Sequence, residues 1–282
     1  PHHYWNSEDG MSEQEFSQYC ADELEKLILA EGPETVGAFI GEPVMGTGGI
    51  IPPPDGYWDT IQKVLNKYEI LLIADEVICG FGRVGTPFGS HLYGIHPDLI
   101  TIAKGLTSAY APLSGVIVGE RVWKVIEQGA AELGPIGHGW TYSGHPLGAA
   151  AGLANLDILE RENLTENARN IGAYFQAQFH QAFDNHPLVG EVRGVGMLGA
   201  LEFVANKSQK RRFDAGWKVG AKVSAACLKQ KLIARAMPHG EILGFAPPLT
   251  ITKAEVDEIV RRTAAALNSV ADQLSKEYSW SG

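Results

Sequence analysis

The stretch IADEVICGFGR (Ile73–Arg83) decides how this chain is interpreted. It continues an apolar run (70–72), which ends directly in two carboxylates, Asp75 and Glu76, and then in glycines. A short apolar run bounded in this way is typical of a buried strand in a parallel sheet. Because ligands bind beyond the carboxyl ends of such strands, we expect the Asp75 carboxylate at a site of chemistry and not in the core.

Two further apolar runs end in charged residues. A strand predicted over Thr35–Ile40 leads into Glu42. Another, predicted over Asp98–Ala103, leads into Lys104. The segment between Asp75 and Lys104 is long enough for a crossover, so these two strands fit side by side in one sheet. We therefore expect all three charged side chains to face one crevice at the sheet edge.

The other elements alternate between helix and strand. This alternation predicts an α/β fold with a mainly parallel sheet over residues 1–160, and the change of pattern from residue 161 predicts a smaller α+β domain over 161–282. The remaining expected helices span Glu13–Ala30, Tyr57–Tyr68 (capped by Asp55), Pro146–Leu159, Thr165–Phe183, Gly216–Gln230 and Lys253–Leu274. The remaining expected strands span Glu69–Ala74, Leu113–Val118, Leu232–Ala236 and Ile242–Phe245. A hairpin is expected in LVGEVRGVGMLGALEFV, directly after the helix over Thr165–Phe183.

Composition limits the class of partner. The chain has 282 residues, of which 45% are hydrophobic and 20% charged, as in ordinary globular proteins. Its formal net charge of -10 argues against nucleic acid or an anionic membrane as partner. No apolar run approaches a membrane span, and no signal peptide is visible.

Cysteine and histidine spacings predict no metal site. Cys20, Cys79 and Cys227 are far apart and fit neither a disulfide framework nor a metal-ligand spacing, so we expect reduced core thiols in a cytoplasmic protein. His2 and His3 lack a nearby Cys or carboxylate at ligand spacing. We interpret them as part of a terminus.

An Asp and a Lys at one sheet edge have two interpretations. The first is a buried ion pair, which spacing alone favours because charged strand ends are common. In the second, a Lys in a low-dielectric crevice is partly deprotonated and forms a Schiff base with an aldehyde. The Asp would then keep a pyridine nitrogen protonated, so that the ring withdraws electrons.

Longer motifs favour the second interpretation. DEVICGFGRVG (Asp75–Gly85), PDLITIAKGL (Pro97–Leu106) and GHGWTYSGHPLGAAAG (Gly137–Gly152) stand in this order along the chain. Together they resemble the class III, pyridoxal-phosphate-dependent aminotransferases of fold type I. The resemblance extends from EPVMGTGG to GFAPPLTIT. It implies pyridoxal 5′-phosphate as the cofactor, with residues 1–160 as part of the large domain that binds it.

The resemblance implies a role for each of five residues. Lys104 corresponds to the lysine that forms the Schiff base and carries the proton between the substrate carbon and the C4′ carbon of the cofactor. Asp75 corresponds to the partner of the pyridinium nitrogen, and Val77 to a side chain packed on one ring face. Thr141 corresponds to a phosphate ligand that reaches the cofactor of the neighbouring subunit. Glu42 corresponds to a residue that orients these groups.

Three of these residues also have a plain structural interpretation. Thr141, together with Ser143, fits equally well as a cap of the following helix. Its place before a helix start also suits anion binding. Val77 fits as a core side chain, and Glu42 as a surface carboxylate at a strand end.

Two positions bear on the substrate. Arg235 follows an apolar run, and the ordinary interpretation of an Arg there is a solvated strand end. In the amine:pyruvate branch of the family, the matching Arg is a mobile gate that pairs bidentately with the carboxylate of the acceptor. The ornithine and 4-aminobutyrate branch has a Glu that masks a comparable Arg, where this chain has Thr47, and this difference argues against ornithine-like substrates. The segment Leu106–Val118, with Tyr110 near Lys104, also resembles the omega-transaminase branch. The implied activity is transfer of an amino group from an omega-amine or omega-amino acid to pyruvate, with Lys104 as base and acid.

The chain departs from the family in its phosphate site. It lacks the Gly-Ser-x-x-Asn loop that cups the phosphate in the family, and it is shorter than family members. We therefore expect a C-terminal portion without the N-terminal segment, acting with an amine donor and a keto acid as a homodimer or homotetramer. The alternatives are a non-catalytic fragment that cannot hold the cofactor alone and an aminomutase of the same family.

Overall fold

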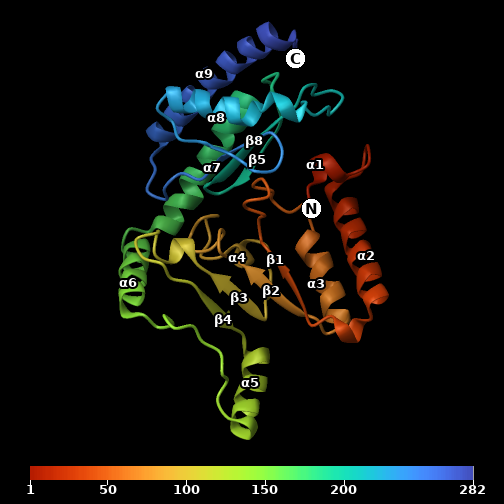
Figure 1. The fold of residues 1–282 in the computed structure, drawn as a ribbon, viewed down its shortest axis with the longest axis vertical. Helices are drawn as coiled ribbons and strands as arrows, with labels where there is room; N and C mark the ends of the chain where they lie inside the picture. Colours follow the sequence, from red (N-terminus) through yellow and green to blue (C-terminus); the bar gives the residue numbers. More distant parts are fainter. Residues whose placement is uncertain (282) are drawn as a thin grey trace. The chain divides into compact units, whose positions relative to one another are not determined.

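The computed structural model describes residues 1–281, which divide into two compact units (Figure 1). The first unit comprises Pro1, Ser7–Val44 and Pro53–Thr165. The second comprises His2–Asn6, Met45–Pro52 and the chain from Glu166 onward. Within residues 1–281, no helix is long and apolar enough to cross a membrane.

The first unit is built on a four-stranded sheet in the order β1-β2-β3-β4 (Figure 1). Its strands are β1 (Ala38–Gly41), β2 (Leu71–Asp75), β3 (Leu99–Ile102) and β4 (Gly115–Val118). β1, β2 and β3 are parallel, as the alternation of strands and helices predicts, whereas β4 is antiparallel to β3. The carboxyl ends of the three parallel strands therefore meet at one edge of the sheet.

Helices α2 (Glu13–Glu31) and α3 (Tyr57–Lys67) form a hydrophobic core with this sheet. Trp58, Ile61 and Leu65 recur at helical spacing on α3 and are buried against Leu72 of β2. The remaining helices of the unit are α4 (Gly89–Leu92), α5 (Glu120–Leu133) and α6 (Pro146–Arg161). The predicted helices and strands of this unit are all present, with changes at their ends.

Two of these changes have clear physical causes. The first strand begins at Ala38 and not at Thr35, because Pro33–Thr35 forms a 3-10 turn. The predicted Asp55 cap of α3 is wrong. Gly56 is the N-cap, with a left-handed φ of 77°, and the Asp55 backbone N–H instead donates to Glu13 Oε2 at 2.9 Å.

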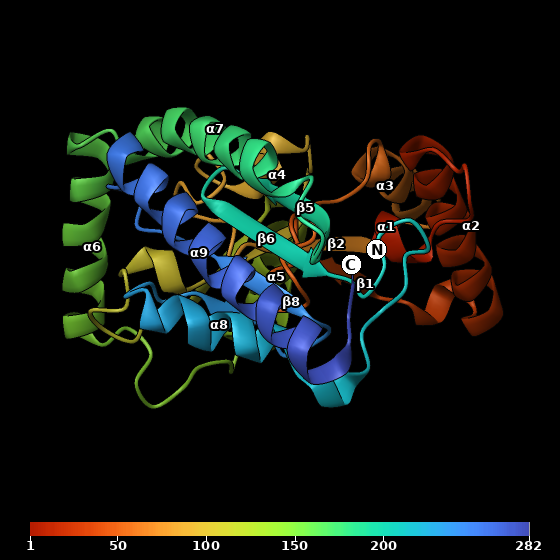
Figure 2. The same cartoon turned by 90° about the horizontal axis from the view of Figure 1, so that it is seen from above.

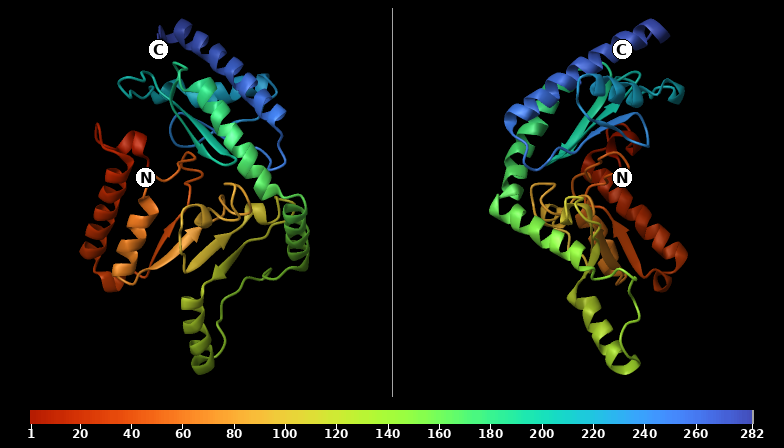
Figure 3. Two further views of the ribbon diagram at one scale, coloured as in Figure 1. Left: turned by 180° about the vertical axis from the view of Figure 1, so that it is seen from behind. Right: turned by 60° about the vertical axis from the view of Figure 1, so that its left-hand side comes forward.

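The second unit has an antiparallel sheet in the order β5-β6-β8-β7. Its strands are β5 (Val189–Val195), β6 (Leu198–Phe203), β7 (Arg235–Ala236) and β8 (Ile242–Phe245), and its longer helices are α7 (Leu164–Phe183), α8 (Val219–Lys229) and α9 (Lys253–Tyr278). These three helices share one core with the sheet (Figures 2 and 3). Phe175, Phe179 and Phe183, spaced four residues apart on α7, are fully buried in it. The predicted hairpin is confirmed as β5–β6.

A short N-terminal helix, α1 (His3–Asn6), belongs to the second unit although it starts the chain. Trp5 Nε1 donates to Glu202 Oε1 of β6 at 2.8 Å, and the Arg212 guanidinium lies 3.7 Å from the centre of the Trp5 ring. The Trp5–Glu202 contact joins residues 197 positions apart in the sequence. No sequence pattern indicates these contacts.

Candidate active site

Three charged residues lie at the carboxyl edge of the first unit's parallel strands. Glu42 follows β1 directly, Asp75 is the last residue of β2, and Lys104 comes two residues after β3. β2 and β3 are neighbours, with Asp75 opposite Thr101 in the register. The parallel topology is therefore what brings these three positions, distant in sequence, to one edge.

The Asp75 carboxylate is half-buried and held in one orientation. Its Oδ1 accepts hydrogen bonds from the Val77 backbone N–H and from Thr101 Oγ1, each at 3.1 Å. Both donors act on the same oxygen, so the carboxylate keeps acceptor capacity for a further N–H group. Within residues 1–281, no ion pair joins Asp75 to Lys104, so the ion-pair interpretation is wrong.

Glu76, the second carboxylate of the opening stretch, has a different environment. Its side chain is completely buried and accepts hydrogen bonds from Gly89 N (2.8 Å), Ser90 N (2.6 Å) and Ser90 Oγ (2.5 Å). Three donors satisfy the carboxylate without a cation. Glu76 therefore anchors the loop that leads from β2 to α4, and the two adjacent carboxylates have separate tasks.

Lys104 is exposed and has a left-handed backbone with φ of 41°. This conformation costs a non-glycine residue about 1–2 kcal/mol. Ser108 (φ 49°) and Ala109 (φ 65°) in the same loop are also left-handed. Such backbone strain is concentrated at functional sites, which supports a functional role for this loop.

Thr101 and Asn155 are site residues that sequence reasoning misses. Thr101 bonds to Asp75 only because the two residues are in register, and register is not visible in an isolated strand. Asn155 contacts the Lys104 loop from the interior of α6. Since Asn is unfavourable inside helices, its presence there is a weak sequence signal of a tertiary contact.

The other predicted site residues of the first unit are half-buried or exposed. Val77, expected at the cofactor ring, is half-buried in the turn after β2, and Tyr110, expected near the substrate, is 90% exposed. Thr141 lies between α5 and α6, where every residue from 131 to 147 is exposed. The alternative that Thr141 or Ser143 caps α6 is wrong, because the N-cap is His145, whose Nδ1 accepts from Leu147 N at 3.3 Å.

Two other residues expected to bear on the substrate, Arg235 and Thr47, belong to the second unit. Arg235 is exposed and begins β7, opposite Gly244 of β8. Thr47 is exposed in a loop whose ends form an isolated antiparallel bridge between Met45 and Ile51.

The cysteines are free thiols. Cys79 and Cys227 are buried, as expected, and burial raises the pKa of Cys79 to about 12 and that of Cys227 to about 11. Cys20 is only half-buried, so its assignment to the core is wrong. Thiols with raised pKa values are poor nucleophiles at neutral pH, which leaves Lys104 as the stronger candidate for covalent chemistry.

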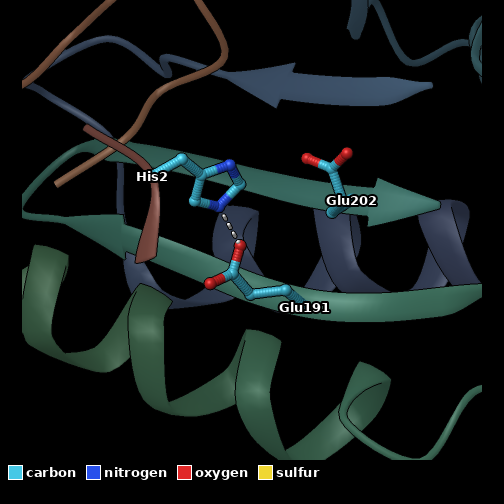
Figure 4. A group of neighbouring side chains, drawn as sticks. All are labelled: His2, Glu191 and Glu202. Carbon is cyan, nitrogen blue, oxygen red and sulfur yellow. Dashed lines mark hydrogen bonds and ion pairs between the residues drawn. The ribbon is translucent and has the colours of Figure 1, made fainter. Parts of the chain in front are cut away.

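A second charged cluster lies in the second unit (Figure 4). His2 Nε2 is 2.8 Å from Glu191 Oε2, and one ligand atom each of His2, Glu191 and Glu202 lies within 4.8 Å of the others. His2 is thus more than part of a terminus, because the fold gives it carboxylate neighbours that are remote in sequence.

Arg193 supplies the cation of this cluster. Its Nη1 lies 2.7 Å from Glu191 Oε2 and 2.8 Å from Glu202 Oε2, the second contact being an ion pair without hydrogen-bond geometry. Arg193 also donates to the carbonyl oxygens of Gly49 and Ile50. A metal ion would have to displace this buried guanidinium, so we interpret the cluster as an ion-pair network.

Comparisons with known proteins identify the family. The family model described as Aminotransferase class-III matches residues 3–267, and the chain belongs to this family. The diaminobutyrate–2-oxoglutarate transaminase of Halomonas elongata is 67% identical over 279 residues, which are 98% of this chain and 60% of that protein. The mitochondrial gamma aminobutyrate transaminase 1 of Solanum lycopersicum is 46% identical over 97% of this chain and 53% of its own length.

Solved structures agree with this assignment. The crystal structure of the omega transaminase from Pseudomonas jessenii in complex with PMP has a TM-score of 0.94 at 45% identity, and the match covers 98% of this chain and 60% of that chain. The fold is therefore that of fold-type I, pyridoxal-phosphate-dependent transaminases. This chain spans 60% or less of the length of these relatives.

Class III aminotransferases are pyridoxal 5′-phosphate enzymes, and the residues at the sheet edge fit this cofactor. Asp75 offers an oriented carboxylate for the ring N–H, Lys104 a primary amine for the aldehyde, and Val77 an apolar side chain for a ring face. For the phosphate, Thr141 offers an exposed hydroxyl. The chemistry of these side chains thus matches the ring and the aldehyde best.

Proposed function

We propose that this chain is part of an aminotransferase that moves an amino group from an omega-amine or omega-amino acid to a keto acid, with pyruvate as the acceptor. The observation that carries the proposal is that Asp75 ends β2 and Lys104 follows the adjacent parallel strand β3, so that both lie at the same edge of the sheet. One is a carboxylate with a fixed orientation, and the other is an amine on strained backbone. Family membership supports the same chemistry.

Each residue of the edge has a distinct task in this proposal. The cofactor would supply an electron-withdrawing ring and an aldehyde that bonds to Lys104 Nζ. Asp75 would accept the ring N–H and so hold that nitrogen protonated, while Val77 would pack on the ring. When Nζ is free, it would take a proton from the substrate carbon and later return one. Glu42 would orient the neighbouring groups.

We propose the first unit as part of the cofactor-binding domain, and the part of the chain from residue 161 onward as the small domain. Arg235, exposed at the start of β7, would bind the acceptor carboxylate in bidentate fashion. Tyr110, exposed in the loop after Lys104, would contact the substrate.

A homodimer as the minimum assembly is also part of the proposal. Residues 131–147 are exposed throughout, and among them Trp140 and Tyr142 are 78% and 80% exposed. Large apolar side chains gathered on one exposed segment are typical of surfaces that another chain covers. Thr141 lies within this segment and would bind the phosphate of the partner's cofactor.

The first experiment adds pyridoxal phosphate to the purified chain and records the visible absorption after desalting. We expect a band from lysine-bound cofactor that disappears in Lys104→Ala. Lys124→Ala is the matched control, because Lys124 is an exposed lysine on α5, away from the edge residues in sequence, and it should keep the band. A chain that is folded by circular dichroism but shows no band would contradict activity of this chain alone.

The second experiment identifies the acceptor. An omega-amine should bleach the band, and a keto acid should restore it. Restoration by pyruvate supports the proposed acceptor, whereas restoration only by 2-oxoglutarate would favour the acceptor in the name of the Halomonas elongata relative. Turnover of a single substrate without any keto acid would indicate an aminomutase instead.

A further inference from the structure

Asn155 contacts the loop that carries Lys104 through three hydrogen bonds. Its Nδ2 donates to the carbonyl oxygens of Gly105 at 2.8 Å and Leu106 at 3.2 Å. Its Oδ1 accepts from Ser108 Oγ at 2.7 Å. One half-buried side chain on α6 therefore binds three residues of the loop beyond Lys104.

This loop needs support because much of it is in an unfavourable conformation. Lys104, Ser108 and Ala109 all have left-handed φ angles, of 41°, 49° and 65°. Non-glycine residues keep such angles only where surrounding contacts hold them. Two hydrogen bonds of Asn155 act on the backbone between Lys104 and Ser108, and the third holds the side chain of Ser108. Together they oppose relaxation of the loop.

Close packing of α6 is what brings Asn155 within reach. Gly148, Gly152 and Asn155 lie on one face of the helix, spaced four and three residues apart. A Cβ atom at Gly148 would lie 3.1 Å from the Pro112 carbonyl oxygen, and one at Gly152 would lie 3.2 Å from a Leu113 side-chain carbon. The two glycines thus allow the helix to approach the loop closely.

An amide is the side chain that matches these partners. Two carbonyl oxygens require an N–H donor for each, and the Ser108 hydroxyl requires an acceptor. An aspartate has the same shape as Asn but would place a carboxylate against two carbonyl oxygens. Asn therefore fits these three partners better than Asp, although the two side chains have the same shape.

We infer that Asn155 is a positioning residue for Lys104: it holds the strained turn after β3, so that the lysine amine stays at the sheet edge. The inference rests on the proposed function, because positioning matters only if Lys104 reacts. Asn155 itself lies outside the motifs that carry the family resemblance.

The test compares Asn155→Asp with Asn167→Asp in the full 282-residue chain. Asn167 is a matched control, because its Nδ2 also donates to two carbonyl oxygens, those of Leu249 (2.6 Å) and Ile251 (3.2 Å), but in the second unit. The two variants therefore lose the same kind of hydrogen bond, and only one of them loses it beside Lys104.

The first readout is hydrogen exchange of backbone amides without cofactor. Thr107 N and Tyr110 N donate within the loop and report its opening. We expect Asn155→Asp to speed exchange over residues 105–111 about tenfold, and Asn167→Asp to leave it unchanged. Ser108→Ala removes only one of the three hydrogen bonds and should give a smaller increase, which keeps the test informative if Asn155→Asp fails to fold.

The second readout is covalent labelling of Lys104 by pyridoxal phosphate and borohydride, mapped by mass spectrometry against Lys124. We expect Lys104 to be labelled in preference to Lys124 in the unaltered chain and in Asn167→Asp. In Asn155→Asp, the ratio of labelling at Lys104 to labelling at Lys124 should fall about tenfold. In Ser108→Ala, this ratio should fall less.

Three results would overturn the inference, and they differ from one another. Unchanged exchange in Asn155→Asp would show that Asn155 does not hold the loop. Faster exchange with undiminished labelling of Lys104 would show that it holds the loop without positioning the lysine. Absence of any Lys104 preference in the unaltered chain would contradict the proposed function itself, and with it the positioning role.

Discussion

Each unit contains a pair of carboxylates, and the two pairs are stabilised by different kinds of partner. In the first unit, Asp75 and Glu76 receive neutral backbone and hydroxyl donors. In the second, Glu191 and Glu202 share the buried cation of Arg193. A carboxylate that is already paired with a cation has little affinity left for a ligand, whereas Asp75 can still accept an N–H group. Charge compensation thus separates the candidate active site from the structural cluster.

The largest expected effect is at Arg193. Because Arg193→Met leaves the buried Glu202 carboxylate without its cation, we expect a loss of about 3–5 kcal/mol in the free energy of unfolding, measured by urea denaturation. Adding Glu202→Gln should recover part of this loss. Arg261→Ala, which breaks an exposed ion pair with Glu258, is the control and should change little. An Arg193→Met variant as stable as this control would contradict the structural role of the cluster.

The adjacent carboxylates of the first unit should separate stability from cofactor binding. Glu76→Ala removes an acceptor from three buried donors and should lower the free energy of unfolding by about 1–3 kcal/mol. Asp75→Ala should cost less stability but abolish retention of the cofactor band after desalting. The reverse pattern would show that the two roles are exchanged.

Thr101 offers a smaller and more specific test. Thr101→Val removes one hydrogen bond to Asp75 without changing the shape of the side chain, and should cost about 0.5–1.5 kcal/mol of stability. It should also weaken retention of the cofactor. Thr101→Ser keeps the hydroxyl and should retain the cofactor as the unaltered chain does. Equal retention by both variants would mean that this hydrogen bond does not orient the carboxylate.

The smallest effect concerns pH. Burial by itself raises the pKa of Glu191, but the hydrogen bond from His2 and the charge of Arg193 outweigh it and hold this pKa below its ordinary value. A carboxyl whose pKa is lower in the folded state than in the unfolded state stabilises the fold at pH values above its unfolded pKa. This stabilisation is lost as the pH falls through its folded pKa. We expect the urea concentration at the midpoint of unfolding to decrease as the pH falls below about 4.5, and Glu191→Gln to weaken this pH dependence. If Glu191→Gln left the pH dependence of stability unchanged, Glu191 would not be its source.

Prediction from sequence succeeds where the signal is local. The apolar runs before Asp75 and Lys104 predict strands β2 and β3, and apolar periodicity predicts α2 and α7 with small errors at their ends. It fails where a distant residue decides the outcome. Gly56 and not Asp55 is the N-cap of α3, and the Asp55 backbone N–H bonds to Glu13 of another helix. The strand predicted over Leu232–Ala236 shortens to the two residues that pair with β8.

Local sequence patterns account for the order of elements and for the charged residues at the strand ends, because hydrophobic period and turn residues act over a few neighbouring positions. Which side chains meet depends instead on how the elements pack in three dimensions. Thr101 reaches Asp75 through strand register, Asn155 reaches the Lys104 loop through helix packing, and His2 reaches Glu191 across nearly two hundred residues. Such contacts depend on the summed burial of whole elements, which no short segment of sequence encodes.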